Sequence, residues 1–397
     1  MGKEGGALRI LDIREKTVRL NTSMSNAAIS FDDMTASVVA VVSDVVREGK
    51  PTVGFGFDSM GRYAHGSLLM ERFAPRVLAA EPDSLLDADG LNIDPVAVWA
   101  TATTNEKPGG HGERAGAVGL LDTALWDLVA KLDNKPLWRV LAELYGDGRG
   151  PEDGTVPVYG SGGHYHAEDD TKRLADELTG MRDRGYTRLK IKGGGAPIDE
   201  DRRRIETALE VVGAGDNLAV DLNGTFDAER AEVFLDAVSP YGLAWVEEVV
   251  DPLDFELQRQ VCETYAGAIG TGENLTSLAD ATNLIRYAGL RPDRDLLQFD
   301  VALSYGVVEY VRILDMLKAN GWKRGRCYPH AGHLLSLHAV AGLGLGCHES
   351  APDGSKIFGG YPDGCQVVGG CVSLPNAPGI GYELKPNLWA VMRELVE

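Results

Sequence analysis

The chain has 397 residues, of which 44% are hydrophobic and 25% charged, and its formal net charge is −20 at pH 7. This length suits two domains with a substantial core, and the acidic balance argues against nucleic acid as a partner because phosphates would be repelled. The five cysteines lack C-x-x-C spacing, which excludes a zinc ribbon or a disulfide framework, and no apolar run is as long as a membrane span. We therefore expect a cytoplasmic protein without membrane partners.

Residues 1–145 are expected to form a small α+β domain. Residues 7–20 and 36–56 have the pattern of β-strands, and residues 67–81 and 114–146 carry helical periodicity. Between the two helical stretches lies a glycine-rich segment, residues 105–113. It is either a plain connection or a loop that binds substrate.

From residue 156 onward, short apolar segments alternate with helical stretches, as parallel strands and their crossover helices do. The strands are expected at 156–161, 188–192, 218–223, 243–248, 268–273, 296–300, 326–330 and 342–349, with the first helices near 168–184, 199–213 and 227–238. Eight such units over about 200 residues match a (β/α)8-type barrel. A doubly wound open sheet is the alternative, but no G-x-G-x-x-G follows a strand and opens a helix.

Polar residues gather at the C-terminal ends of these expected strands, which is the end where barrel enzymes have their active sites. In chain order they are Lys190, Lys192, Asp221, Asn223, Glu247, Glu248, Glu273, Asp300, His330 and Glu349. Side chains at these ends converge on one small space, so separate solvation explains the pattern poorly. We expect an active site there.

Three of the acids, Asp221, Glu247 and Glu273, are evenly spaced along the chain. Brought together without a cation they would repel and raise one another's pKa, whereas a hard divalent cation such as Mg²⁺ suits all-oxygen ligation. Three separate salt bridges to arginines at the barrel rim are the alternative. The neighbour Glu248 should point to the other side of the strand, and the even spacing favours Glu247 as the ligand.

Two kinds of acid–base residue flank these carboxylates. Lys190 and Lys192 are two positions apart and should face the same way, so each should lower the pKa of the other and make a lysine usable as a general base. Asp300 ends the strand before His330, where it could hydrogen-bond the imidazole, fix its tautomer and raise its pKa. The pattern indicates a lysine general base and a catalytic histidine.

This arrangement resembles the mandelate racemase branch of the enolase superfamily. The resemblance covers almost the whole chain and implies an α+β capping domain (1–145), a (β/α)7β barrel (146–360) and a tail (361–397) that returns to the cap, in a homo-oligomer. Longer strings are similar to D-tartrate dehydratases: NEKPGGHGER (105–114), GGAPIDEDR (194–202), GENL (272–275), RPDRD (291–295), LQFDVALSYG (297–306) and PHAGH (329–333).

The resemblance also implies a role for each matched residue. Asp221, Glu247 and Glu273 would bind Mg²⁺, Lys192 would remove the proton next to the substrate carboxylate, and His330 with Asp300 would protonate the leaving hydroxyl. The resemblance also implies that Lys107, in the glycine-rich segment, contacts a substrate carboxylate. We further expect substrate contacts from Lys190, Asn223, Glu349, Arg62 and His164, and Arg62, His164 or His166 could take the role of Lys107. The implied reaction is dehydration of an acid sugar through an enediolate, and tartrate would give oxaloacetate.

Other activities remain open at this point. A racemase or epimerase could use the same residues, with His330 returning a proton to carbon. A retaining glycosidase uses paired carboxylates in a barrel, although a third acid and two lysines count against it. A sugar-acid sensor would bind the ligand without turnover.

Overall fold

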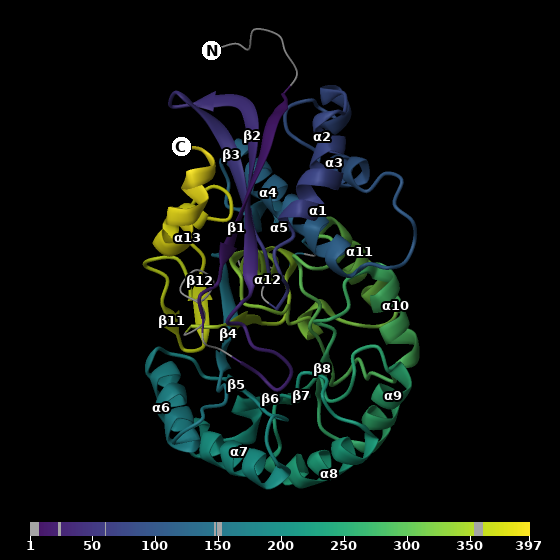
Figure 1. The fold of residues 1–397 in the computed structure, drawn as a ribbon, viewed down its shortest axis with the longest axis vertical. Coiled ribbons are helices and arrows are strands. Elements are labelled where there is room, and N and C mark those ends of the chain that lie inside the picture. The colour runs from purple at the N-terminus through teal and green to yellow at the C-terminus, as the bar shows by residue number, and fades with distance from the viewer. Residues whose placement is uncertain (1–7, 23–24, 60, 147, 149–152, 353–359) are drawn as a thin grey trace.

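A computed structural model describes residues 8–22, 25–59, 61–146, 148, 153–352 and 360–397. Residue 7, the first of the expected strand 7–20, lies outside this part. Figure 1 shows the barrel strands and their ring of helices in the lower half, with a three-stranded sheet and further helices above them. The C-terminal end of the chain lies in the upper half of this view.

The upper sheet is antiparallel in the order β1-β2-β3, with β1 (Ile10–Arg19), β2 (Thr35–Arg47) and β3 (Lys50–Phe57). Helix α4 (Gly112–Leu132) packs on β3, and it can do so because Gly54 has no side chain: a Cβ there would lie 2.1 Å from the carbonyl oxygen of Ala124. Further helical segments are α1, η1 and α2 together (66–78), the short η2 (Pro82–Leu85), α3 (Pro95–Ala102), which periodicity did not predict, and α5 (Leu137–Tyr145).

The lower part of the fold is a barrel of parallel strands. Its strands are β4 (Thr155–Gly162), β5 (Leu189–Lys192), β6 (Leu218–Asp221), β7 (Trp245–Glu247), β8 (Ile269–Thr271), β9 (Leu296–Leu297) and β10 (His348–Ser350). They pair in this order up to β9, Cys327 forms a parallel bridge with Leu297 in place of a seventh strand, and β10 pairs with β4. This confirms the predicted (β/α)7β barrel with an α+β cap, and the open sheet is wrong.

Most barrel strands are shorter than predicted, because the backbone leaves the sheet at residues in the left-handed region. Asn223 has a φ of 50°, Glu248 of 41° and Gly272 of 117°, each just after its strand. The expected strand 342–349 is wrong in its first half. Residues up to Leu343 belong to a helix, which Gly344 ends with a φ of 67°.

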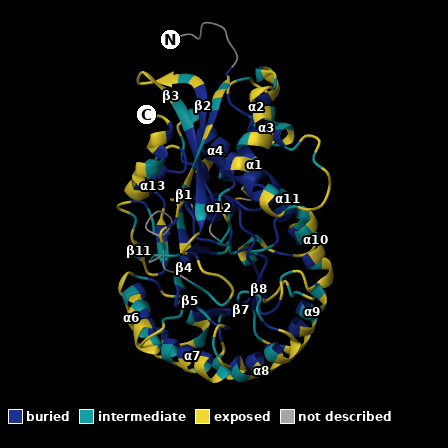
Figure 2. Ribbon diagram, viewed as in Figure 1, coloured by how far each residue is buried: buried dark blue, intermediate teal, exposed yellow. Residues whose placement is uncertain are grey.

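The helices around the barrel are amphipathic, and Figure 2 shows their outward faces exposed and their inward faces buried. They are α6 (Asp170–Asp183), α7 (Ile198–Val212), α8 (Ala228–Val238), α9 (Phe255–Thr264), α10 (Leu278–Tyr287) and α11 (Val307–Ala319). A further helix, α12 (Leu334–Leu343), is buried along its whole length. Side chains accept the first backbone N–H groups of several of them, as Asp227 does for α8 and Ser277 for α10. Among the described residues, no helix is both long and apolar enough to cross a membrane.

The C-terminal residues contact both parts. Strand β12 (Cys371–Ser373) pairs with β4 and with β11 (Val367–Val368), while helix α13 (Pro386–Met392) packs against β2. Arg14 on β1 donates a hydrogen bond of 2.8 Å to the carbonyl oxygen of Leu395. The tail therefore ties the cap to the barrel, while the proposed domain boundaries stay a prediction.

Candidate active site

A cavity of about 370 Å³ lies at the C-terminal ends of the barrel strands. Cap residues Asn26, Ala28, Ile29, Phe31, Gly61 and Arg62 line it, together with barrel residues Ser161, His164, Lys192, Asn223, Gly224, Glu248, Asp251, Pro252, Glu273, Asn274, Leu303, His330, Ala331, Glu349 and Ala351. The cap therefore roofs a site whose polar groups come from the barrel.

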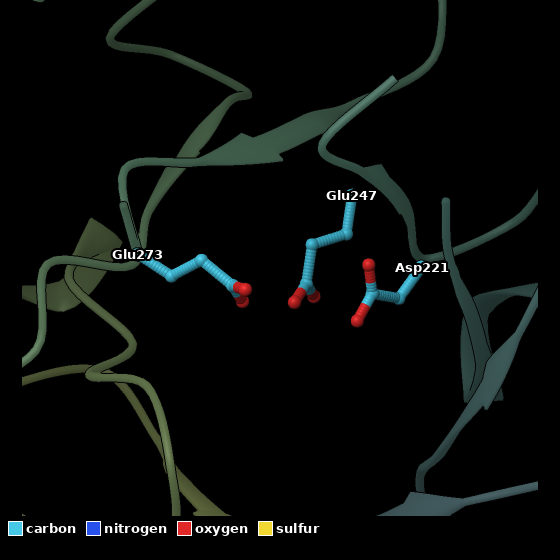
Figure 3. Close-up of side chains that lie close together, drawn as sticks. All are labelled: Asp221, Glu247 and Glu273. Carbon is cyan, nitrogen blue, oxygen red and sulfur yellow. The ribbon is translucent and has the colours of Figure 1, made fainter. Parts of the chain in front are cut away.

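The carboxylates of Asp221, Glu247 and Glu273 point toward one another at the base of this site (Figure 3). One oxygen from each lies within 4.8 Å of the others, and Asp221 and Glu247 are fully buried. Burial raises the pKa of Glu247 to about 7, although the adjacent ammonium group of Lys190 acts to lower it. Such a cluster could hold a divalent cation.

Two neighbours orient the buried Glu247. The indole Nε1–H of Trp245 and the amide of Gln298 donate to Glu247 Oε2, at 2.9 and 2.7 Å. These bonds hold one carboxylate oxygen and leave Oε1 for the inner part of the site. Strand alternation did not identify either donor, since both come from positions that read as ordinary core.

The two lysines do lie together on β5, as predicted, but they are not equivalent. Lys190 is fully buried, with its Nζ 2.5 Å from Glu247 Oε1, 3.0 Å from Glu349 Oε1 and 3.8 Å from Asp221 Oδ2. Lys192 lines the cavity and pairs with Asp221 Oδ2 at 2.5 Å. Lys192 is thus the lysine that can reach a bound molecule.

Lys190 acts to lower the pKa of Lys192, as expected, but this effect does not decide the net shift of that pKa. Burial and the neighbouring ammonium group do act to lower the pKa of Lys192, but Asp221 outweighs them, and the pKa is raised. The carboxylates, not the lysine pair, determine the charge balance of the site.

The predicted histidine–aspartate pair is present. His330 Nδ1 lies 3.0 Å from Asp300 Oδ2, and its Nε2 lies 3.7 Å from Glu273 Oε2. Burial alone would lower the pKa of His330, but the charge of Glu273 and the bond to Asp300 raise it to about 9. The imidazole is therefore cationic near neutral pH, with Asp300 holding one nitrogen and the other turned toward the cavity side.

Glu248 does not face away from the site as predicted, because its left-handed backbone lies outside the regular strand. Its side chain lines the cavity and accepts two hydrogen bonds from the amide of Asn274, at 3.0 and 2.9 Å. Arg62 of the cap donates to Asn274 Oδ1 at 2.7 Å. The hydrogen bonds from Arg62 to Asn274 and from Asn274 to Glu248 link the cap to the barrel. Asn274 is the residue directly after Glu273, so its position next to a predicted metal ligand could have identified it from the sequence.

The remaining predicted contacts divide between the cavity and the surface. Asn223 donates its backbone N–H to Asp221 Oδ1 at 2.9 Å, and Glu349 Oε2 accepts from the N–H of Ala331 at 3.1 Å. His164 lines the cavity, where burial and then Lys192 lower its pKa to about 3. Lys107 is exposed and does not line the cavity, so its predicted substrate contact is not supported in this single chain.

A barrel with acid–base residues at its strand ends, and a cap that covers them, is the architecture of a class of barrel enzymes. Residues 173–388 match the family model described as Enolase C-terminal domain-like, and the chain belongs to the enolase superfamily.

Relatives and solved structures agree with this assignment. An L-talarate/galactarate dehydratase from Salmonella typhimurium is 28% identical, over 78% of this chain and 71% of that protein. A 3,6-anhydro-alpha-L-galactonate cycloisomerase from Streptomyces coelicolor is 29% identical, over 76% of this chain and 78% of that protein. The solved L-talarate dehydratase from Polaromonas sp. JS666, complexed with Mg and L-glucarate, shares the fold with a TM-score of 0.74 at 21% identity, over 93% of this chain and 92% of that one.

Proposed function

We propose that this protein is a Mg²⁺-dependent dehydratase of acid sugars, with D-tartrate as the first substrate to test. One observation carries the proposal: Lys192 and the His330–Asp300 pair reach one cavity from different sides of a carboxylate cluster. Around the barrel, β4 and β10 separate the strand of Lys192 from the segment that follows Cys327. A base and an acid so separated suit removal of a proton from one carbon and of a hydroxyl from the next.

The donor set at the base of the cavity fits Mg²⁺. Asp221, Glu247 and Glu273 offer hard oxygen ligands within 4.8 Å of one another, and Glu273 borders the open cavity. When bound there, Mg²⁺ would supply positive charge that offsets the negative charge developing on the substrate carboxylate as the neighbouring proton leaves. The acid-sugar relatives and the Mg-bound neighbour support this assignment.

The chain's own residues account for the proton transfers. Lys192, in its uncharged form, accepts the α-proton, because Lys190 is enclosed by Glu247 and Glu349 and does not border the cavity. His330 then gives its Nε2 proton to the β-hydroxyl, which leaves as water, since hydroxide is a poor leaving group. Asp300 holds Nδ1 and keeps the ring aimed. The enol that remains tautomerises to a keto acid; from tartrate it is oxaloacetate.

An isomerase of the same superfamily is the second candidate, and the cycloisomerase relative favours it. The same lysine and histidine could then exchange protons at carbon without loss of water. Solvent deuterium in recovered substrate, with no keto acid formed, would identify this activity.

The test is a keto-acid assay with Mg²⁺ across four- to six-carbon aldonic and aldaric acids, D-tartrate included. We expect keto acid from at least one acid and loss of turnover on chelation. Glu273→Gln should weaken metal binding and abolish turnover, whereas Glu263→Gln, an exposed position on α9, should behave like the wild type. Full activity of Glu273→Gln after chelation and desalting would refute the metal assignment. Absence of keto acid from the whole panel would refute the dehydratase.

A further inference from the structure

The carboxylate of Asp300 has more hydrogen-bond donors than a histidine partner requires. Oδ1 accepts from the backbone N–H groups of Ala302 and Leu303, at 2.8 and 2.9 Å, and lies 3.2 Å from His333 Nε2. Oδ2, the oxygen that binds His330, also accepts a short hydrogen bond from the hydroxyl of Ser59. Both carboxylate oxygens are therefore fixed.

His333 supports Asp300 from within the barrel. Its Nδ1 accepts the N–H of Ser336 at 3.1 Å at the start of α12, so the ring proton is on Nε2 and is directed at Asp300. With the two backbone donors, it fixes Oδ1 without any help from the cap. Oδ2 is different, since the donor that joins His330 there belongs to another part of the molecule.

Ser59 is a cap residue, two positions after the end of β3, and its exposed fraction is 2%. Its neighbour Asp58 is bound on several sides: Oδ2 accepts the N–H of Ser37 at 2.7 Å, and Oδ1 lies 2.9 Å from His65 Nδ1. The other ring nitrogen of His65 lies 2.9 Å from Glu113 Oε2, although not aligned for a hydrogen bond. The backbone that presents the Ser59 hydroxyl is thus held in place by buried polar contacts.

Other cap residues hold the segment 300–307 that follows Asp300. A Cβ on Gly119 of α4 would lie 1.7 Å from the carbonyl oxygen of Ala302, so helix and loop meet backbone to backbone. Asp122, also on α4, accepts the N–H of Val307 at 2.6 Å. Trp99 and Arg114 donate to the carbonyl and the hydroxyl of Tyr305, at 3.1 and 2.8 Å. By contrast, the ion pairs of Lys190 and Lys192 in the described part of the chain are with barrel carboxylates.

We infer that Ser59 is a positioning residue through which the cap aims the His330–Asp300 pair. Because Asp300 is fully buried, water cannot replace a lost donor at Oδ2, and the carboxylate would reorient around its Oδ1 contacts. His330 would then lose its alignment toward the leaving hydroxyl. Ser59 itself exchanges no proton: the N–H bond of His330 and the C–O bond of the substrate break, and water forms.

This inference rests on the proposed function, since it assigns Ser59 to the acid step. The first measurement uses Ser59→Ala and Ser59→Thr with D-tartrate, or with the acid that the wild type dehydrates best, in D₂O. In Ser59→Ala we expect keto-acid formation to fall about 10- to 100-fold in kcat while α-proton exchange is retained and KM changes less than about twofold. Ser59→Thr keeps a hydroxyl and should restore most of the rate, and Ser84→Ala, an exposed cap serine, should match the wild type.

A second measurement does not depend on turnover. In protein labelled with ¹⁵N at histidine, the Nδ1–H resonance of His330, assigned by its loss in His330→Asn, should move in Ser59→Ala and stay in Ser84→Ala. An unchanged resonance overturns the inference whatever reaction the enzyme performs. Equal loss of exchange and dehydration in Ser59→Ala, without rescue by threonine, also overturns it, because the hydroxyl would then only support the fold. A wild type that forms no keto acid but shows the shift refutes the proposed function alone.

Discussion

The two sides of the cavity are built in different ways. On one side, Lys192 projects from β5, between paired strands, and its partner Asp221 is on the next strand. On the other side, Asp300 and His330 follow β9 and Cys327, in segments that leave the sheet, and cap residues hold part of that backbone. The lysine side takes its geometry from paired strands, whereas the geometry of the histidine side also depends on the position of the cap.

This difference suggests that the two sides have different tasks: one removes the proton, and the other decides what the resulting anion becomes. Removal of a proton next to a carboxylate is the step that members of a superfamily with this site could share, and rigid strands suit it. What happens to the resulting anion depends on the second side, where loops and cap meet. We expect substitutions on the lysine side to stop all chemistry, and those on the histidine side to change its outcome.

The largest effect is expected for Lys192→Ala. Without the base, α-proton exchange and keto-acid formation should both fall by roughly 10²–10⁴-fold, because neither proceeds without proton removal. Substrate NMR in D₂O measures both rates in one experiment, and Lys172→Ala, an exposed lysine on α6, is the matched control. Exchange that survives in Lys192→Ala would reverse the roles of the two sides.

His330→Asn should give a more selective loss. Asparagine can still occupy the space near Asp300 but cannot donate an ionisable proton, so we expect dehydration to fall by roughly 10²–10⁴-fold while α-proton exchange continues. Asp300→Asn should lower dehydration in the same way but to a smaller extent, because it removes only the carboxylate that orients the His330 ring. Dehydration at the wild-type rate in both variants would mean that the acid lies elsewhere.

A smaller effect is expected where the cap meets the substrate. Arg62 lines the cavity and Lys107 does not, so Arg62→Ala should raise KM for dicarboxylates by about tenfold and spare monocarboxylates. Lys107→Ala should change neither class in a single chain. If Lys107→Ala alone weakens dicarboxylate binding, the loop 105–113 reaches a site in another copy, which would support the predicted homo-oligomer.

Substitution of His338, on α12, should have the smallest effect on activity. It should nevertheless change the stability of the protein measurably. His338 Nδ1 accepts the N–H of Trp138 and its Nε2 donates to the carbonyl of Ile380, and burial lowers its pKa to about 4. Because the folded pKa lies below the ordinary value of about 6.5, its stabilising contribution is complete above that pH and is lost as the pH falls toward 4.

The comparison variant for this residue is His338→Gln. Between about pH 7 and pH 5, the wild type should lose roughly 2 kcal/mol more of its free energy of unfolding than the variant does. Urea unfolding at the two pH values measures this difference. Equal losses in both proteins would show that His338 does not contribute to the acid sensitivity.

The sequence predicted those parts of the site that depend on strand alternation. Periodicity predicts the barrel, and the strand ends predict Asp221, Glu247 and Glu273 as one cluster, which the structure contains. The His330–Asp300 pair followed from the same rule. These residues can be predicted from the sequence because consecutive parallel strands bring their C-terminal ends together whatever the conformation of the loops.

The parts that failed depend on backbone conformation outside the strands. Glu248 enters the cavity because its φ is 41°, which no alternation rule anticipates for a glutamate. Ser59 contacts Asp300 across a separation of 241 residues, and one serine after a strand carries no pattern. The predicted contact of Lys107 rests on loop resemblance, which does not determine whether a side chain faces the cavity of its own chain.

The glycine at position 119 has a consequence for protein engineering. Since α4 meets the carbonyl of Ala302 with no room for a Cβ, the surfaces of helix and loop are complementary at the level of the main chain. A chimera that takes its cap from a relative, in order to exchange the roof of the pocket, would therefore have to import residues 300–307 from the same donor. Transplanting the cap alone would alter specificity and misalign the proton donor in one step.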